Sequence, residues 1–191
     1  MQLIPYIIMA CWAAFIIFWI ISAFNVKRNI SRSPWQRLAW VRVSIALVVI
    51  GWIWGTSSWA KVTNHLWFLH FNIYGPVGLA GAVLCVVGIA IAIWARVYLG
   101  RNWSGSPSLK QDHELVTSGP YALVRHPIYT GIMIATLGST LASPVWLIMF
   151  FVVTALFIWR VHVEEALMMH QFPTQYPEYK KRTWALIPWV W

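Results

Sequence analysis

The sequence has few charged residues and very few acids. Of its 191 residues, 10% are charged and 60% are hydrophobic, and Asp and Glu together number only five. Soluble domains carry about 25% charged residues, so this chain has too little charge to coat a water-exposed globule. The composition excludes a soluble enzyme, a DNA-binding domain and a disordered tail. It indicates one integral membrane domain over residues 1–191.

Cysteine is also scarce. The two cysteines, Cys11 and Cys85, both fall inside apolar runs. This placement argues against a disulfide framework and against a metal site, and both thiols are expected to act as small packing residues. No small-residue cleavage site follows the first apolar run, so a cleaved signal peptide is not expected.

Long apolar runs and tryptophan are abundant. The 15 tryptophans suit a protein that meets bilayer–water interfaces. Apolar runs predict an all-α membrane bundle of about five transmembrane helices. The runs cover residues 3–24, 38–60, 75–99, 127–142 and 145–159. The fourth is short and Ser143-Pro144 ends it, so the last two runs are predicted to form a helical hairpin.

Basic residues alternate between the loops. They are dense in the first loop, the third loop and the C-terminal tail: Lys27, Arg28, Arg32, Arg37; Arg101, Lys110, Arg125; Lys180, Lys181, Arg182. The second loop carries only Lys61. The positive-inside rule places the basic segments in the cytoplasm and the N-terminus outside. The net charge of +9 then suits an anionic membrane face rather than nucleic acid.

Small residues four apart recur in three runs and predict close helix packing in lipid. The pairs are Gly51 and Gly55, Gly88 and Ala92, and Gly131 and Ala135.

Two of the five acids, Glu164 and Glu165, lie where the last run meets the cytoplasm. Ionisable residues at membrane depth are costly and commonly functional. Arg160 and Glu164 are four apart and His162 and Glu165 three apart, so each pair shares a helix face. A simpler interpretation is that Arg160 and Glu164 only neutralise each other near the interface.

The third loop is long, polar and rich in turn formers. Pro127 fits the first position of the fourth helix, with His126 at its cap. The first turns, which hold Tyr129 and Gly131, collect free N–H groups and a positive dipole end. Such a helix start can hold the carboxylate of an amino-acid-like cofactor, although this loop alone favours an ordinary proline-started helix with a cap.

The remaining polar and aromatic features predict little chemistry. His65 and His70 are expected to be interfacial. A metal site from His126, His162 and His170 lacks any supporting pattern, so no metal is expected. Residues 184–191 are expected to anchor the chain at the interface.

Together these blocks resemble the isoprenylcysteine carboxyl methyltransferase family and the related phospholipid methyltransferases. The matching segments lie in order: His113-x-Leu115-Val116-x-Ser118-Gly119-x-Tyr121, Arg125-His126-Pro127-x-Tyr129-x-Gly131, and Glu164-Glu165 followed by Phe172, Tyr176, Tyr179 and Lys180-Lys181-Arg182. The resemblance covers about residues 75–188. Residues 1–74, with the first two spans and the outer loop, carry no matched motif, and residues 75–191 form the cofactor-binding and catalytic part.

The resemblance implies an S-adenosylmethionine-dependent enzyme with a cytoplasmic cofactor-binding loop and a C-terminal helical segment. It implies that the cofactor site draws on His113, Glu114, Leu115, Val116, Tyr121, His126, Pro127, Ile128, Tyr129, Glu164 and Glu165. Arg160 would meet the methyl acceptor and act with Glu164 in catalysis. No G-x-G-x-x-G follows a strand, so a soluble-type Rossmann methyltransferase is not expected.

The acceptor is expected to be lipophilic, either a small molecule or a prenylated substrate reached through membrane lipid, with no obligate protein partner. Arg160 favours a carboxylate acceptor, which is already ionised at neutral pH. An amine acceptor, as in phospholipid N-methylation, would need Glu164 or Glu165 as its base. The sequence also leaves open an NADPH-dependent sterol-type reductase, which shares His-Pro-x-Tyr, and a non-enzymatic channel or structural bundle.

Overall fold

The computed structural model describes residues 3–23, 75–100, 115–143 and 146–190. These residues form α1 (Leu3–Ala23), α4 (Pro76–Leu99), the 3-10 helix η3 (Gly119–Ala122), α5 (Pro127–Ala142), α6 (Trp146–Gln171) and α7 (Gln175–Arg182). Their β structure is limited to one isolated bridge between Val124 and Trp184. The predicted all-α class is confirmed.

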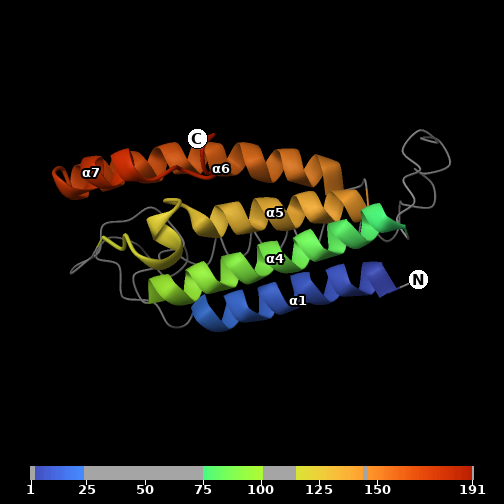
Figure 1. The fold of residues 1–191 in the computed structure, drawn as a ribbon. Helices are drawn as coiled ribbons and strands as arrows, with labels where there is room; N and C mark the ends of the chain where they lie inside the picture. The colour runs from blue at the N-terminus through green and yellow to red at the C-terminus, as the bar shows by residue number, and fades with distance from the viewer. Residues whose placement is uncertain (1–2, 24–74, 101–114, 144–145, 191) are drawn as a thin grey trace.

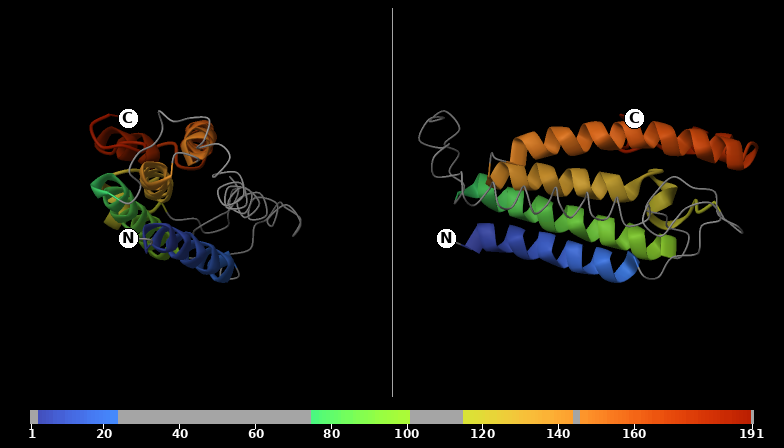
Figure 2. Two further views of the ribbon diagram at one scale, coloured as in Figure 1. Left: turned by 90° about the vertical axis from the view of Figure 1, so that its right-hand side faces the viewer. Right: turned by 180° about the vertical axis from the view of Figure 1, so that it is seen from behind.

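The four long helices α1, α4, α5 and α6 lie side by side in that order (Figure 1), and the view from behind in Figure 2 agrees. Among the described residues, three helices are long and apolar enough to cross a membrane: Leu3–Ser22, Pro76–Leu99 and Trp146–Gln171. They match three predicted spans. The predicted second span, residues 38–60, lies outside the described residues, as does the outer loop that follows it.

The predicted fourth span is a shorter apolar helix, α5, with the expected bounds. Pro127 occupies its first turn and Ser143 ends it in an extended conformation. The Trp146 N–H then donates to the Ser143 carbonyl oxygen at 3.0 Å as α6 begins, which confirms the helical hairpin. The 16 residues of α5 rise about 24 Å, less than the hydrocarbon thickness of about 30 Å.

Helices α4 and α5 touch backbone to backbone through glycines. A Cβ atom built on Gly88 would lie 2.4 Å from the Ala135 nitrogen, and one on Gly131 would lie 2.6 Å from the Ala92 nitrogen. Gly81 and Gly138 repeat this contact further along the pair. The small-residue spacing therefore predicted this interface, while Gly51 and Gly55 lie outside the described residues. The close contact fixes α5, which follows His126 directly and carries Tyr129 in its first turn.

Helix α1 packs its buried face against α4 and reaches α5. The Trp12 indole N–H donates to the Ser139 hydroxyl at 3.0 Å and its ring stacks on Trp146 at 5.5 Å. Cys85 is buried in the same core and Cys11 packs at its edge. Both thiols are free, which agrees with their predicted packing role.

The C-terminal segment, residues 184–190, divides into two parts. Ala185 and Leu186 are each only 1% exposed, whereas Trp189 and Val190 are 82% and 75% exposed. The prediction of an interfacial anchor over residues 184–191 is therefore wrong for Ala185 and Leu186, which fold back into the protein. Their return depends on partners 56 or more residues away in sequence, which local composition does not reveal.

Candidate active site

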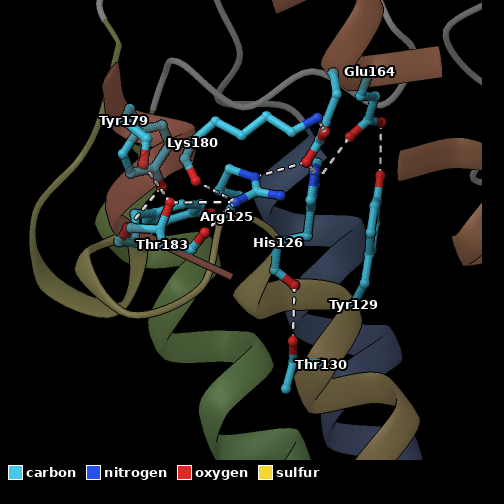
Figure 3. Close-up of polar contacts among 10 residues, drawn as sticks. Arg125, His126, Tyr129, Thr130, Glu164, Tyr179, Lys180 and Thr183 are labelled. Carbon is cyan, nitrogen blue, oxygen red and sulfur yellow. Dashed lines mark hydrogen bonds and ion pairs between the residues drawn. The ribbon is translucent and has the colours of Figure 1, made fainter. Parts of the chain in front are cut away.

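Polar side chains gather where the start of α5, the second half of α6, and α7 with the C-terminal segment meet (Figure 3). The turn before α5 carries Arg125 and His126, and the first turn of α5 carries Tyr129. Helix α6 contributes the two adjacent acids. The site is thus assembled from segments that are separated in sequence and brought together at one end of the bundle (Figure 1).

Glu164 is the centre of one half of the site. Its Oε1 accepts hydrogen bonds from the Tyr129 hydroxyl and from Arg160 Nε, each at 2.7 Å. The Arg160 guanidinium carbon also lies 5.8 Å from the centre of the Tyr129 ring, within cation–π range. The predicted Arg160–Glu164 pair is therefore present, and it is joined to a tyrosine of the neighbouring helix.

The Tyr129 ring is held between two other rings. Phe157 stacks on it at 4.4 Å and His126 at 5.4 Å, with interplanar angles of 15° and 1°. These stacks fix the direction of the hydroxyl toward Glu164. The side chain of Glu164 remains 20% exposed, so this half of the site is within reach of a ligand.

Glu165 is the centre of the other half. Arg125 Nε donates to its Oε1 at 2.7 Å and Lys180 Nζ donates to its Oε2 at 2.6 Å. Glu165 is buried, and a buried carboxylate is costly unless cations and hydrogen bonds compensate it. Both of its oxygens are therefore engaged by cations from other elements.

His126 lies between the two acids. Its Nδ1 is 3.6 Å from Glu164 Oε2 and its Nε2 is 3.9 Å from Glu165 Oε1, both beyond hydrogen-bonding distance. The Nε2 atom is buried and, within the part of the chain that the structure describes, has no hydrogen-bond partner. His126 is the N-cap residue of α5, as predicted, but its side chain does not cap the helix.

Burial lowers the pKa of His126 below its usual 6.5, and the charges of Arg125 and Arg160 add to this, against the two carboxylates, which favour protonation. The imidazole is therefore neutral at physiological pH. One ring nitrogen of a neutral imidazole donates a hydrogen bond and the other accepts one. The site thus offers a ligand an uncharged group beside the charged pairs.

The other predicted site residues surround this cluster or lie elsewhere. His113 and Glu114 lie outside the described residues. Leu115 and Val116 are half-buried, and Val116 packs on the cluster formed by Ala95, Tyr121 and Ile128. Tyr121, Ile128 and Pro127 are buried behind the polar groups. The Tyr121 hydroxyl donates to the Ala95 carbonyl oxygen at 3.3 Å, so its polar end is used within the protein.

Three residues of the cluster were not predicted as site residues: Arg125, Lys180 and Thr183. Arg125 Nη1 donates to the Thr183 carbonyl oxygen, and also to the Lys180 carbonyl oxygen at 3.4 Å. Arg125 and Lys180 both lie in the matched motifs, and this position could have marked them as site residues. The motifs did not reveal that Glu165 is their common partner.

Within the described residues, no three His, Cys, Asp or Glu side chains are placed to hold a metal ion. The charged groups of the site are arranged as ion pairs with one another.

The family model described as "Isoprenylcysteine carboxyl methyltransferase (ICMT) family" matches residues 81–170. The match spans 90 of the chain's 191 residues, and over these residues the chain is similar to this family. The matched region contains Arg125, His126, Tyr129, Arg160 and both acids of the site. The family's helical membrane architecture agrees with the apolar helices of this chain, which is an integral membrane protein.

Several curated relatives bear the family's name. The chain is 35% identical over 152 residues to a protein-S-isoprenylcysteine O-methyltransferase of Schizosaccharomyces pombe, a match that covers 71% of this chain and 61% of that protein. It is 31% identical over 150 residues to the Homo sapiens protein-S-isoprenylcysteine O-methyltransferase, covering 70% of this chain and 49% of that protein. The chain thus spans only about half to six tenths of the length of these two relatives.

A solved structure shares the fold. It is described as the eukaryotic intramembrane Ras methyltransferase ICMT, and it matches with a TM-score of 0.60 and 22% sequence identity over 84% of this chain and 55% of that chain. The likeness shows that the two chains share a helical fold.

Proposed function

We propose that this protein transfers a methyl group from S-adenosylmethionine to the carboxylate of a lipophilic, isoprenylcysteine-like acceptor. The observation that carries the proposal is the group formed by Arg160, Tyr129 and Glu164 beside a buried, neutral His126. The group combines a cation that can bind a carboxylate with an anion and aromatic faces that suit a sulfonium. The names of the relatives support the same reaction.

The residues of the cluster fit such a donor. His126 Nε2 is a buried polar atom that lacks a partner among the described residues, and Glu164 Oε2 lies 3.6 Å from His126, outside hydrogen-bond range. These atoms can receive polar groups of the donor, and the Tyr129 ring can lie against a cation. We assign Leu115, Val116, Tyr121, Pro127 and Ile128 to the supporting wall, and His113 and Glu114 to the same site.

S-adenosylmethionine, when bound, supplies an electrophilic methyl group on a sulfonium. The chain's part is to hold the acceptor in line with that methyl group and to exclude water, which can contribute about 7–11 kcal/mol in favourable cases. The acceptor carboxylate then forms an ester bond as the carbon–sulfur bond breaks. The products are a methyl ester and a neutral thioether, with no proton transferred.

Arg160 orients the acceptor. Its Nε–H is donated to Glu164, and a guanidinium presents its N–H donors in a fixed plane. That fork matches the two oxygens of a carboxylate. The ion pair with Glu164 holds the guanidinium in one direction while the acceptor binds.

The state of the acids favours a carboxylate acceptor over an amine. An amine would need a base to take its proton. Both oxygens of Glu165 are engaged by cations, and Oε1 of Glu164 accepts from Arg160 and Tyr129. Glu165 is therefore a weak base, because pairing with Arg125 and Lys180 stabilises its charged form.

The depth of the site suits a lipophilic acceptor. From Trp146 to Glu164, α6 rises about 27 Å, close to the hydrocarbon thickness of about 30 Å. The site therefore lies near the membrane boundary, where an acceptor with its lipid chain in the bilayer can meet a soluble donor. The start of α1 and the helix α7 lie at opposite ends of the bundle (Figure 1), so an N-terminus and a site on opposite sides of the membrane fit the fold. We assign the side of α7 to the cytoplasm because of its basic residues.

Labelled methyl transfer tests the proposal. Purified protein in vesicles is given methyl-labelled S-adenosylmethionine and a prenylated cysteine, and the product is treated with mild base. Volatile labelled methanol is expected, because a methyl ester is hydrolysed. Label that resists base and appears in phospholipid would instead indicate N-methylation. Stabilisation by NADPH, with none by S-adenosylhomocysteine, would contradict the proposal in favour of a reductase.

A further inference from the structure

The half of the site centred on Glu165 is built from three separate elements. The acid comes from α6, Arg125 from the turn before α5, and Lys180 from α7. The side chains of Glu165 and Arg125 are only 9% and 6% exposed. An exposed ion pair contributes little, but losing one partner of a buried carboxylate leaves a charge uncompensated.

The same region also binds the C-terminal segment to the turn that carries His126. The Arg125 N–H donates to the Trp184 carbonyl oxygen at 2.8 Å, and the His126 N–H donates to the Ala185 carbonyl oxygen at 3.1 Å. The Thr130 hydroxyl donates to the Leu186 carbonyl oxygen at 2.7 Å. His126 is therefore held from its backbone by the C-terminal segment.

A third connection comes from Tyr179, on the same helix as Lys180. Its hydroxyl donates to the Tyr121 carbonyl oxygen at 2.6 Å, while Arg125 Nη1 bonds to the carbonyl oxygens of Lys180 and Thr183. Helix α7 is thus bonded to η3 through Tyr179 and to the turn before α5 through Lys180. Figure 3 shows Tyr179, Lys180 and Thr183 beside Arg125. None of these contacts involves Glu164 or Arg160, the groups assigned to the reaction.

We propose that Arg125, Glu165 and Lys180 form a positioning clamp that holds His126 in place beside Glu164, so that the donor site is complete only when α7 and the C-terminal segment are docked. The inference rests on the proposed function and deepens it. Arg125 and Lys180 act through Glu165 and are positioning residues. The two acids therefore have different roles. Glu164 takes part in the reaction, and Glu165 positions His126.

The chain offers a matched control for this proposal. Lys180 and Lys181 are neighbours on α7, and each is paired with a glutamate: Lys180 with Glu165 at 2.6 Å and Lys181 with Glu178 at 2.7 Å. The side chain of Glu178 is 63% exposed, whereas that of Glu165 is 9% exposed. Replacing either lysine by alanine removes the same charge, but only Lys180→Ala weakens the clamp.

The test compares Lys180→Ala, Lys180→Arg and Lys181→Ala in the full chain. Calorimetry gives the Kd for S-adenosylhomocysteine, steady-state transfer gives the KM of donor and acceptor, and thermal unfolding gives the Tm. Loss of groups that orient a site commonly costs about 10-fold to 100-fold. We expect Lys180→Ala to raise the Kd and the donor KM by about 10-fold or more. The acceptor KM is expected to stay unchanged, Lys180→Arg to restore the Kd, and Lys181→Ala to match the parent protein.

Two results would overturn the clamp and leave the proposed function in place. One is a Kd for Lys180→Ala equal to that of Lys181→Ala. The other is a lowered Tm for Lys180→Ala with an unchanged Kd and donor KM, which would mean that the Lys180–Glu165 pair only stabilises the fold. Arg125→Lys serves as a second variant that keeps the charge, and the clamp predicts a weakened Kd because a single ammonium cannot make all the contacts of the guanidinium. If the parent protein itself fails to bind S-adenosylhomocysteine, the proposed function falls, and the clamp with it.

Discussion

The α4–α5 pair and helix α6 are packed in opposite ways. In the apolar stretch of α4, 39% of the residues are buried, against 6% in that of α6. Helices α4 and α5 meet through glycines with backbone atoms in contact, whereas the buried residues of α6 are only Val161 and Glu165. The tightly packed pair α4 and α5 holds His126 and Tyr129 in place. The lightly packed helix α6 brings Arg160 and Glu164 next to these two residues.

This difference predicts a division of roles. Substitutions between α4 and α5 should lower stability, because a packed interface cannot yield. Substitutions on the site-facing side of α6 should lower turnover with little loss of stability. Those on the outer face of α6 should do neither.

The largest effect is expected from Arg160→Ala, which takes the acceptor's orienting group from α6. Removing one preorganised polar group from a reaction centre commonly costs about 100-fold or more in turnover, so kcat/KM should fall by about 100-fold. The affinity for S-adenosylhomocysteine should remain, because the donor side is left in place. Arg182→Ala, an exposed residue on α7, serves as the control. Equal losses of transfer and donor binding would remove the role assigned to Arg160.

The next effect is on stability. A Cβ atom on Gly138 would lie 2.5 Å from the Gly81 carbonyl oxygen and 2.6 Å from the Cys85 nitrogen. Gly138→Leu should therefore destabilise the fold by about 3 kcal/mol, measured by thermal unfolding in detergent. Its neighbour Leu137 is 41% exposed, and Leu137→Ala should change stability by no more than about 0.5 kcal/mol. Similar unfolding temperatures for the two variants would show that the α4–α5 interface is not tightly packed.

A smaller loss is expected where α1 reaches the rigid pair. Trp12→Phe removes the buried hydrogen bond to Ser139 and keeps most of the ring, so it should cost about 1 kcal/mol. Trp94, 55% exposed on α4, gives the control Trp94→Phe, for which little change is expected. Unfolding curves that agree for both variants would contradict the role of this bond.

The smallest effect concerns pH and His126, which lies between the two regions. Its pKa in the folded protein is lowered by burial, so the unfolded chain binds more protons as the pH falls through about 6.5. The free energy of unfolding should be highest above that pH and should fall as the pH is lowered below it. Unfolding followed from pH 7.5 to 5.5 should show a weaker decline for His126→Gln than for the parent protein. A steeper decline in the variant would contradict a lowered pKa of His126 in the folded protein.

The sequence was sufficient for the parts of the fold that depend on local pattern. Hydropathy located α1, α4 and α6, Pro127 and Ser143 marked the ends of α5, and small-residue spacing predicted close helix packing, which the structure shows between α4 and α5. The i, i+4 spacing of Arg160 and Glu164 was likewise enough to predict their pairing. Each of these features is set by neighbours within a few residues.

The rest depended on contacts that no local pattern encodes. Arg125 is 40 residues from Glu165, and the Thr130–Leu186 bond joins positions 56 apart. Helical spacing gave the face on which Glu165 lies, but its partners come from the turn before α5 and from α7. The burial of Leu186 within a tryptophan-rich tail was missed for the same reason.

The central claim is tested most directly by calorimetric titration of the purified protein with S-adenosylhomocysteine. The parent protein should bind it, and Glu164→Gln and His126→Ala should each weaken binding by about 10-fold or more, while Arg182→Ala binds like the parent. An absence of binding by the folded parent protein, or equal affinity in all four proteins, would contradict a donor site between the start of α5 and α6.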